Sequence, residues 1–189
     1  MTNADATAGS ALKRGLLRAA SAADAAVGLL CRIVLVITGI GLMGVLTANV
    51  IARYVLATGG FDWAQEVPER LFPWFIMAGV ALAAQQGGHI AVEWLLGRLG
   101  RQGRRWLLLA GHALVIVAYS MLVREALVVA EIAEIERSPA LGLSGSHGYW
   151  AIAAGCALLT IGTLTNALRV ALLGPEALPR PTAAAEATA

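Results

Sequence analysis

The sequence predicts an all-α membrane protein that crosses the bilayer four times. Its mean hydropathy is +0.72, and hydrophobic residues make up 58% of the 189 positions, whereas charged residues make up 14%. A soluble globular domain carries about 25% charged residues. Four stretches are long and apolar enough to cross about 30 Å of hydrocarbon as helices, which pair every backbone amide within the segment. The four predicted spans are 27–52, 67–86, 106–129 and 149–173.

The first span, 27–52, follows an N-terminal segment, 1–26, that carries basic residues. Its apolar run is longer than the roughly 7 to 15 residues of a signal-peptide core, so we expect a retained membrane anchor. The N-terminal segment has enough helical periodicity to form a partly amphipathic helix on the cytoplasmic surface of the membrane. At the other end of the chain, the Ala- and Pro-rich segment 174–189 is predicted to be a disordered cytoplasmic tail.

The second span, 67–86, contains two prolines near its start. Pro68 suits a first helical turn, whereas Pro73 removes an amide donor and collides with the carbonyl of Glu69. The sequence therefore predicts either a kink or break near 69–72 or a helix that begins late, and we favour the late start. In the same turn, Glu66 lies three residues before Glu69 and four before Arg70, a spacing that allows an acid pair and an ion pair.

The connection after the second span begins with Gly87 and Gly88, which end the helix. The next residues are predicted to form a short amphipathic segment that lies flat on the membrane before the basic run RLGRQGRRW. His89 either ties off the helix end, which we favour, or serves as a proton carrier or metal ligand. The basic run leads into the third span, 106–129, and an acidic connection leads from there to the fourth, 149–173.

The distribution of basic residues predicts that both termini are cytoplasmic, because Lys and Arg near the ends of spans resist translocation. Ten basic residues then lie on the inner side: Lys13, Arg14, Arg18, Arg32, Arg98, Arg101, Arg104, Arg105, Arg169 and Arg180. Four lie on the outer side: Arg53, Arg70, Arg124 and Arg137. The outer acidic residues are Asp62, Glu66, Glu69, Glu125, Glu131, Glu134 and Glu136. This acidic rim either steers a basic partner or consists of solvated loop ends.

Polar and small residues in the spans indicate contacts between helices. Asn49 and Arg53 share one face of the first span, where they either bond to another helix or Arg53 extends to the headgroups. Small residues on three spans allow helices to approach closely, either within the chain or against a partner. These are Gly39, Gly41, Gly44, Gly79, Ala83, Ala151 and Gly155.

In order and spacing, the motifs of this chain resemble the small membrane subunit of tripartite ATP-independent periplasmic (TRAP) transporters, the DctQ-like family. The resemblance covers roughly residues 30–172. It is carried by Asn49-x-x-x-Arg53-Tyr54, Trp63-x-x-Glu66, Trp74 and Gly79, Gly87-x-His89-Ile90-x-Val92-Glu93, and Ser138-Pro139-Ala140-Leu141-Gly142.

The resemblance implies a three-part importer in a bacterial inner membrane. A periplasmic binding protein would capture an organic acid, often a C4-dicarboxylate or another carboxylate, and a large membrane subunit would carry the substrate and sodium sites. This chain would grip the large subunit and help the binding protein to dock, with no cofactor of its own and no nucleic-acid partner. The candidates for the large-subunit interface are Asn49, Arg53, Trp63, Glu66, Trp74, Gly79 and His89. The candidates for periplasmic docking are Glu66, Glu69, Glu131, Glu134 and Arg137.

Other functions have less support in the sequence. A haem- or quinone-binding anchor of a respiratory enzyme would use His89 and His112, but both lie close to span ends. A four-helix multidrug exporter needs a carboxylate in the membrane, and no span carries an acid near its middle. The chain contains no CxxC, HExxH or GxxxxGK[ST] pattern, and we expect no enzyme activity.

Overall fold

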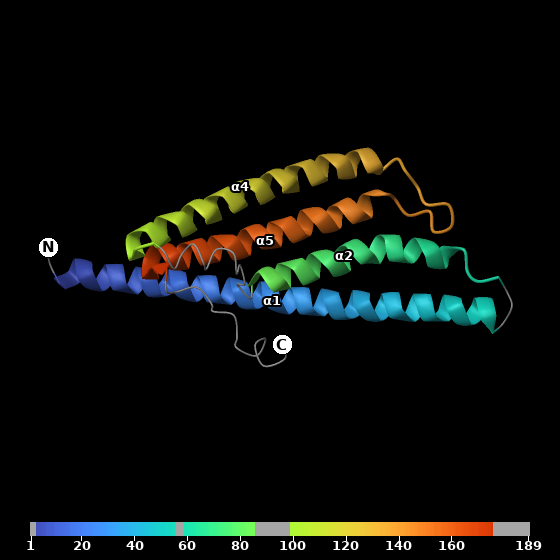
Figure 1. The fold of residues 1–189 in the computed structure, drawn as a ribbon, viewed down its shortest axis with the longest axis horizontal. Coiled ribbons are helices and arrows are strands. Elements are labelled where there is room, and N and C mark those ends of the chain that lie inside the picture. Colours follow the sequence, from blue (N-terminus) through green and yellow to red (C-terminus); the bar gives the residue numbers. More distant parts are fainter. Residues whose placement is uncertain (1–2, 56–58, 86–98, 176–189) are drawn as a thin grey trace.

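The computed structural model describes residues 3–55, 59–85 and 99–175, with side chains described from Leu12 onward. These residues form four helices: α1 (Asn3–Tyr54), α2 (Trp63–Gln85), α4 (Arg101–Ala133) and α5 (Ser146–Leu173). All four are long and apolar enough to cross a membrane. They lie side by side along one direction (Figure 1), which confirms the predicted all-α, four-span fold. The amphipathic segment predicted after the second span lies outside the described residues, as does most of the predicted tail.

The two ends of the bundle differ in the elements that meet there. At the terminal end, α1 begins, α5 ends and α4 begins (Figure 1). At the loop end, α1 ends, α2 begins, and the connection 134–145 joins α4 to α5. The start of α1 and the end of α5 therefore lie on the same side of the bundle, as four crossings require. That this side is cytoplasmic stays a prediction.

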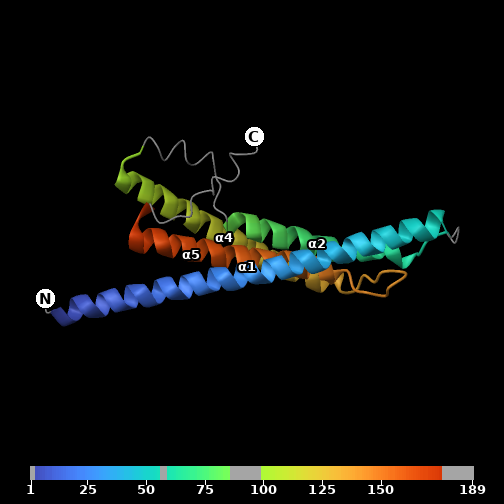
Figure 2. The same ribbon diagram turned by 90° about the horizontal axis from the view of Figure 1, so that it is seen from below.

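The first helix is longer than its predicted span. It runs without interruption from Asn3 to Tyr54, so the N-terminal segment and the span 27–52 form one helix. Its N-terminal part extends beyond the other three helices (Figure 2). The segment is helical, as its periodicity predicts, and its place on the membrane surface stays a prediction.

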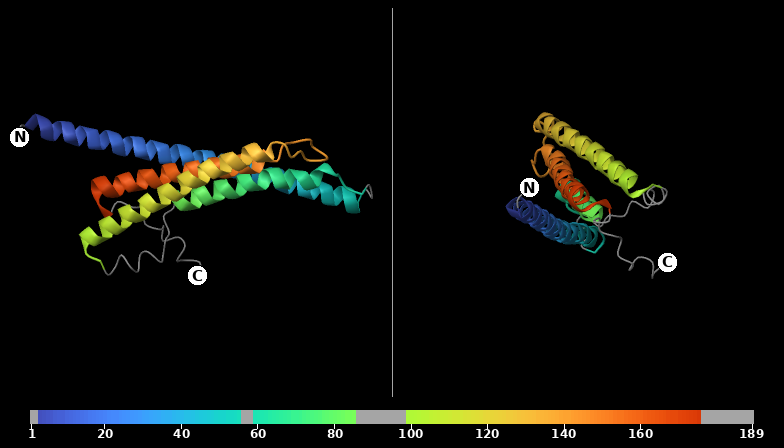
Figure 3. Two further views of the ribbon diagram at one scale, coloured as in Figure 1. Left: turned by 90° about the horizontal axis from the view of Figure 1, so that it is seen from above. Right: turned by 90° about the vertical axis from the view of Figure 1, so that its left-hand side faces the viewer.

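The preference for a late start of the second helix is wrong. Helix α2 begins at Trp63 and contains both Pro68 and Pro73. Both prolines lie inside the helix, beyond its first turn. Each removes one backbone hydrogen bond, which bends a helix without ending it. The axis of α2 changes direction partway along its length (Figures 1 and 3). Pro73 packs against Gly148, where an added Cβ would lie 3.6 Å from the proline ring.

Helix α5 is the centre of the bundle. It packs against α1, α2 and α4, whereas α4 packs mainly against α5. The buried core near the middle joins three helices and consists of Val27 and Cys31 of α1, Ala78 and Ala81 of α2, and Leu159 of α5.

Most of the small residues named above serve packing within the chain. A Cβ on Gly39 would lie 3.1 Å from Phe75, and one on Gly155 would lie 2.6 Å from the Cβ of Met77. Gly41 and Gly79 likewise face side chains of the neighbouring helix, and Ala151 is fully buried. Gly44 differs, because nothing lies within 4 Å of the position of its missing Cβ. Gly39, Gly41, Gly79 and Gly155 therefore pack within the chain, whereas Gly44 has no such neighbour among the described residues.

Candidate functional surfaces at the two ends of the bundle

At the loop end, the first turns of α2 hold the connection between α4 and α5. The two carboxylate oxygens of Glu66 accept hydrogen bonds from the backbone amides of Ala140 and Leu141, at 2.8 and 2.9 Å. One turn later, the guanidinium of Arg70 donates to the carbonyl of Ser144 at 2.8 Å. Glu66 and Arg70, one helical turn apart, thus bond to the same connection at two points.

The connection 134–145 also bonds to itself. The amide of Ser138 donates to the carbonyl of Leu143 at 2.9 Å, and the amide of Gly142 donates to the carbonyl of Ser138 at 3.0 Å. Gly142 has a φ of +65°, a conformation that glycine adopts at little cost. Arg137 donates to the carbonyl of Gly142 at 3.3 Å. The result is a closed turn whose shape is set by its own backbone and by Glu66.

The turn between α1 and α2 is held by Asn49. Its side-chain oxygen accepts the amide of Phe61 at 2.9 Å, and the backbone of Gly60 passes so close that a Cβ there would lie 2.9 Å from the same oxygen. Phe61 stacks on Trp63 with ring centroids 5.4 Å apart. Asn49 therefore bonds within its own chain, while Arg53 is exposed and lies over the ring of Tyr54.

The other predicted site residues occupy separate positions. Trp74 is half-buried on α2, and Gly79 faces Leu35 of α1. Glu69, Glu131 and Glu134 are exposed at the loop end. His89 lies outside the described residues. The structure thus brings Glu66 and Arg137 to one connection, and Asn49 and Trp63 to one turn.

A polar cluster at the terminal end was not predicted. Asp24 of α1 forms an ion pair with Arg169 of α5 at 2.5 Å, and the hydroxyl of Thr165 donates to the same carboxylate at 2.6 Å. The side chain of Gln85 donates to the backbone carbonyl of Asp24 at 3.2 Å. Asp24 precedes the predicted span 27–52, in a segment expected on the membrane surface, so no helix partner was expected for it. Thr165 and Arg169, four residues apart on one helical face, were the available signal.

The described residues offer little to a metal or haem. Within the described ranges, no group of three or more His, Cys, Asp or Glu side chains could hold a metal ion. His112 uses its Nδ1 in a contact of 2.6 Å with the carbonyl of Leu108, one turn earlier in the same helix.

These features define an integral membrane protein of four helices with its polar anchors at the two ends. Residues 42–173 match the family model described as the DctQ component of tripartite ATP-independent periplasmic transporters. The match covers more than half of the chain, and the protein belongs to this family. Asp24 lies ahead of the matched residues and Arg169 within them, so their ion pair ties the N-terminal part of α1 to the family domain.

The chain is also similar to a protein of Sinorhizobium fredii (strain NBRC 101917 / NGR234) named "Uncharacterized protein y4mM". The two are 50% identical over 143 residues, which make up 76% of this chain and 26% of that protein. The match thus spans about a quarter of the relative's length.

Proposed function

We propose that this chain is the small permease subunit of a TRAP transporter in a bacterial inner membrane, with both termini in the cytoplasm. It scaffolds the large transport subunit and helps the periplasmic binding protein to dock. The complex takes up an organic acid, a C4-dicarboxylate or another carboxylate, together with sodium ions that bind to the large subunit.

The observation that carries the proposal is the placement of charge in a chain that belongs to the DctQ family. No Asp, Glu, Lys or Arg occurs in the central half of any of the four predicted spans, 27–52, 67–86, 106–129 and 149–173. Carboxylates and other ionisable groups within the membrane commonly mark substrate and ion pathways. The ion pair and the Glu66 bonds instead join helices and connections at the ends, which suits a scaffold.

The apolar faces of the helices give such a scaffold a surface for a membrane partner. In the most apolar stretch of α1 only 11% of the residues are buried within the chain. Membrane helices associate through close packing and polar contacts rather than through hydrophobic force. Gly44 on α1 keeps an open flank of this kind. The proposed interface residues that the structure describes, Asn49, Arg53, Trp63, Glu66, Trp74 and Gly79, all belong to α1 and α2.

At the loop end, the proposed docking surface combines acidic and apolar side chains. Glu69, Glu131 and Glu134 are exposed, and Ile135 beside them is 89% exposed. Charges at the rim of an interface speed association and set orientation. A binding protein with a complementary basic patch fits this surface.

The proposal is tested by purifying the tagged full-length chain from native membranes in mild detergent and identifying what accompanies it. We expect one large polytopic subunit. A photo-crosslinking residue at Met43 of α1 should label that subunit, whereas one at Leu114 of α4 should not. The two positions are a matched pair, because both side chains are 71% exposed on apolar faces. Recovery of flavoprotein or iron–sulfur partners instead would contradict the proposal and favour a respiratory membrane anchor.

A further inference from the structure

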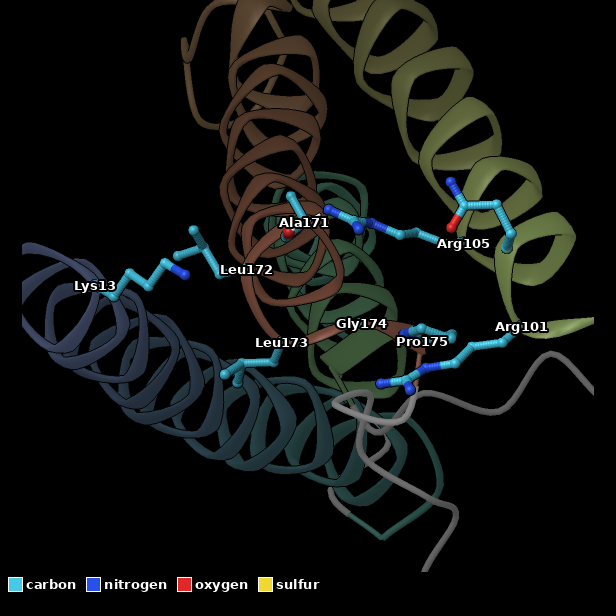
Figure 4. A pocket seen from close by; sticks show the side chains of 9 residues that line it. Lys13, Arg101, Arg105, Ala171, Leu172, Leu173, Gly174 and Pro175 are labelled. Atoms are coloured by element: carbon cyan, nitrogen blue, oxygen red, sulfur yellow. Dashed lines mark hydrogen bonds between the residues drawn. The ribbon is translucent and has the colours of Figure 1, made fainter. Parts of the chain in front are cut away.

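The terminal end of the bundle contains a cavity whose lining is strongly basic. It has a volume of about 620 Å³ and lies between the start of α4, the end of α5 and the N-terminal part of α1 (Figure 4). The described residues that line it are Lys13, Arg101, Gln102, Arg105, Ala171, Leu172, Leu173, Gly174 and Pro175. Three of these side chains are cationic and none is acidic, so the cavity favours an anion.

One of the three cations is fixed in place. Arg105 donates to the carbonyl of Ala171 in the last turn of α5 at 2.7 Å. This bond offsets the partial negative charge at the C-terminal end of α5, which by itself would repel an anion. A guanidinium has five N–H donors, so Arg105 keeps donors for a further ligand.

The other two cations have no partner among the described residues. Lys13 extends from α1, and Arg101 from the first turn of α4, toward the end of α5 (Figure 4). Neither makes a hydrogen bond or an ion pair within the described part of the chain. Both are exposed. Two side chains from different helices therefore line one cavity from opposite sides of the end of α5 (Figure 4), and neither is paired within the ranges that the structure describes.

The lining of the cavity also contains apolar side chains. Leu172 and Leu173 line it, and Leu173 is 53% exposed. Trp106, next to Arg105, is exposed as well, and tryptophan is typical of the boundary between lipid and water. A ligand in this cavity therefore meets both cationic and apolar side chains.

We propose that the cavity binds the phosphodiester headgroup of an anionic phospholipid from the leaflet at the terminal end. Arg and Lys side chains bind phosphate oxygens through charge-assisted hydrogen bonds. Basic pockets between membrane helices are suited to anionic headgroups. The leucines then lie along the lipid's glycerol and acyl chains, a contact that free phosphate cannot make. This inference does not depend on the proposed transport function.

The test uses the full-length chain, purified in detergent and depleted of lipid, in native mass spectrometry. Phosphatidylglycerol, phosphatidylcholine and inorganic phosphate are the three probes. We expect phosphatidylglycerol to bind more tightly than phosphatidylcholine, and K13Q/R101Q to lower its affinity about 30-fold, since each basic residue near an anionic surface contributes roughly fivefold. The control R18Q/R32Q removes the same charge from α1 outside the cavity and should change the affinity by less than about twofold.

Three results would overturn the proposal. They are equal affinity for the two lipids, an equal loss in K13Q/R101Q and in the control, and displacement of phosphatidylglycerol by millimolar phosphate, which would indicate a site for a free anion. Arg105 stays unchanged throughout because it holds the end of α5. The single variants K13Q and R101Q, each expected to lose about fivefold, provide the measurement should the double variant fold poorly.

Discussion

The carboxylate of Asp24 and the guanidinium of Arg169 form an ion pair 2.5 Å long that joins α1 to α5. Both side chains are about four-fifths buried, with 21% and 20% of their surfaces exposed. Thr165 donates a further hydrogen bond to the carboxylate at 2.6 Å. The pair thereby fixes the long first helix against the central helix at the level where α2 ends.

Replacing one member of this pair should destabilise the bundle. We expect D24N to lower the free energy of unfolding by about 2 kcal/mol, below the roughly 3–5 kcal/mol of a fully buried pair because some solvent reaches these side chains. Unfolding in detergent, followed by tryptophan fluorescence, measures the change. The control is E125Q, since the Glu125–Arg124 pair is exposed, at 63% and 82%, and such pairs contribute at most about 1 kcal/mol. An equal loss of unfolding free energy in D24N and E125Q would show that the buried pair contributes no more to stability than the exposed pair.

Removing the charge of Glu66 should loosen the connection 134–145. In E66Q the side chain keeps one acceptor oxygen for two backbone amides, so one of Ala140 and Leu141 loses its partner. We expect faster amide hydrogen exchange in this connection, with little change in the helices. Hydrogen-exchange mass spectrometry measures it. The matched control is E69Q, three residues along the same helix and exposed; protection that is unchanged in E66Q would argue against the anchoring role.

A side chain at Gly155 should force α2 and α5 apart. A Cβ there would lie 2.6 Å from the Cβ of Met77, which has no freedom to rotate away. We expect G155A to destabilise the bundle by about 1–3 kcal/mol, as overpacking does. G44A is the control, because nothing lies within 4 Å of its Cβ position and alanine favours the helix by up to about 1 kcal/mol. Thermal unfolding in detergent compares the stabilities of the two variants. If G155A were as stable as the unchanged protein, this would contradict the close approach of α2 and α5.

The acidic rim should affect how fast the periplasmic partner binds more than how long it stays. We expect E131Q/E134Q to slow association with the binding protein several-fold at low salt, with a smaller difference at high salt, because screening removes long-range attraction. Surface plasmon resonance on the reconstituted complex measures both rates. E125Q, further back along α4, should leave them unchanged. A change confined to dissociation would show that these residues make direct contacts instead.

Much of the fold could be predicted from local chemistry. The apolar runs predicted four spans in the correct order, and Glu66 was singled out because it lies at the mouth of the second span. The start of α2 was predicted wrongly because Pro73 was expected to delay the helix, whereas the helix begins ten residues earlier, at Trp63. Pro73 lies beside Gly148 of another helix, a contact distant in sequence that no local pattern predicts.

The class of protein follows from the sequence, since length, apolarity and the positions of charge control whether a chain can cross lipid. The positions of Asn49, Trp63 and Glu66 at the ends of spans follow from it as well. What those residues bond to depends on the folded arrangement of the helices, because partners such as Glu66 and Ala140 are 74 residues apart. The same holds for Asp24 and Arg169 and for the basic cavity at the terminal end. Each depends on how three helices converge, and no local pattern along the chain encodes that convergence.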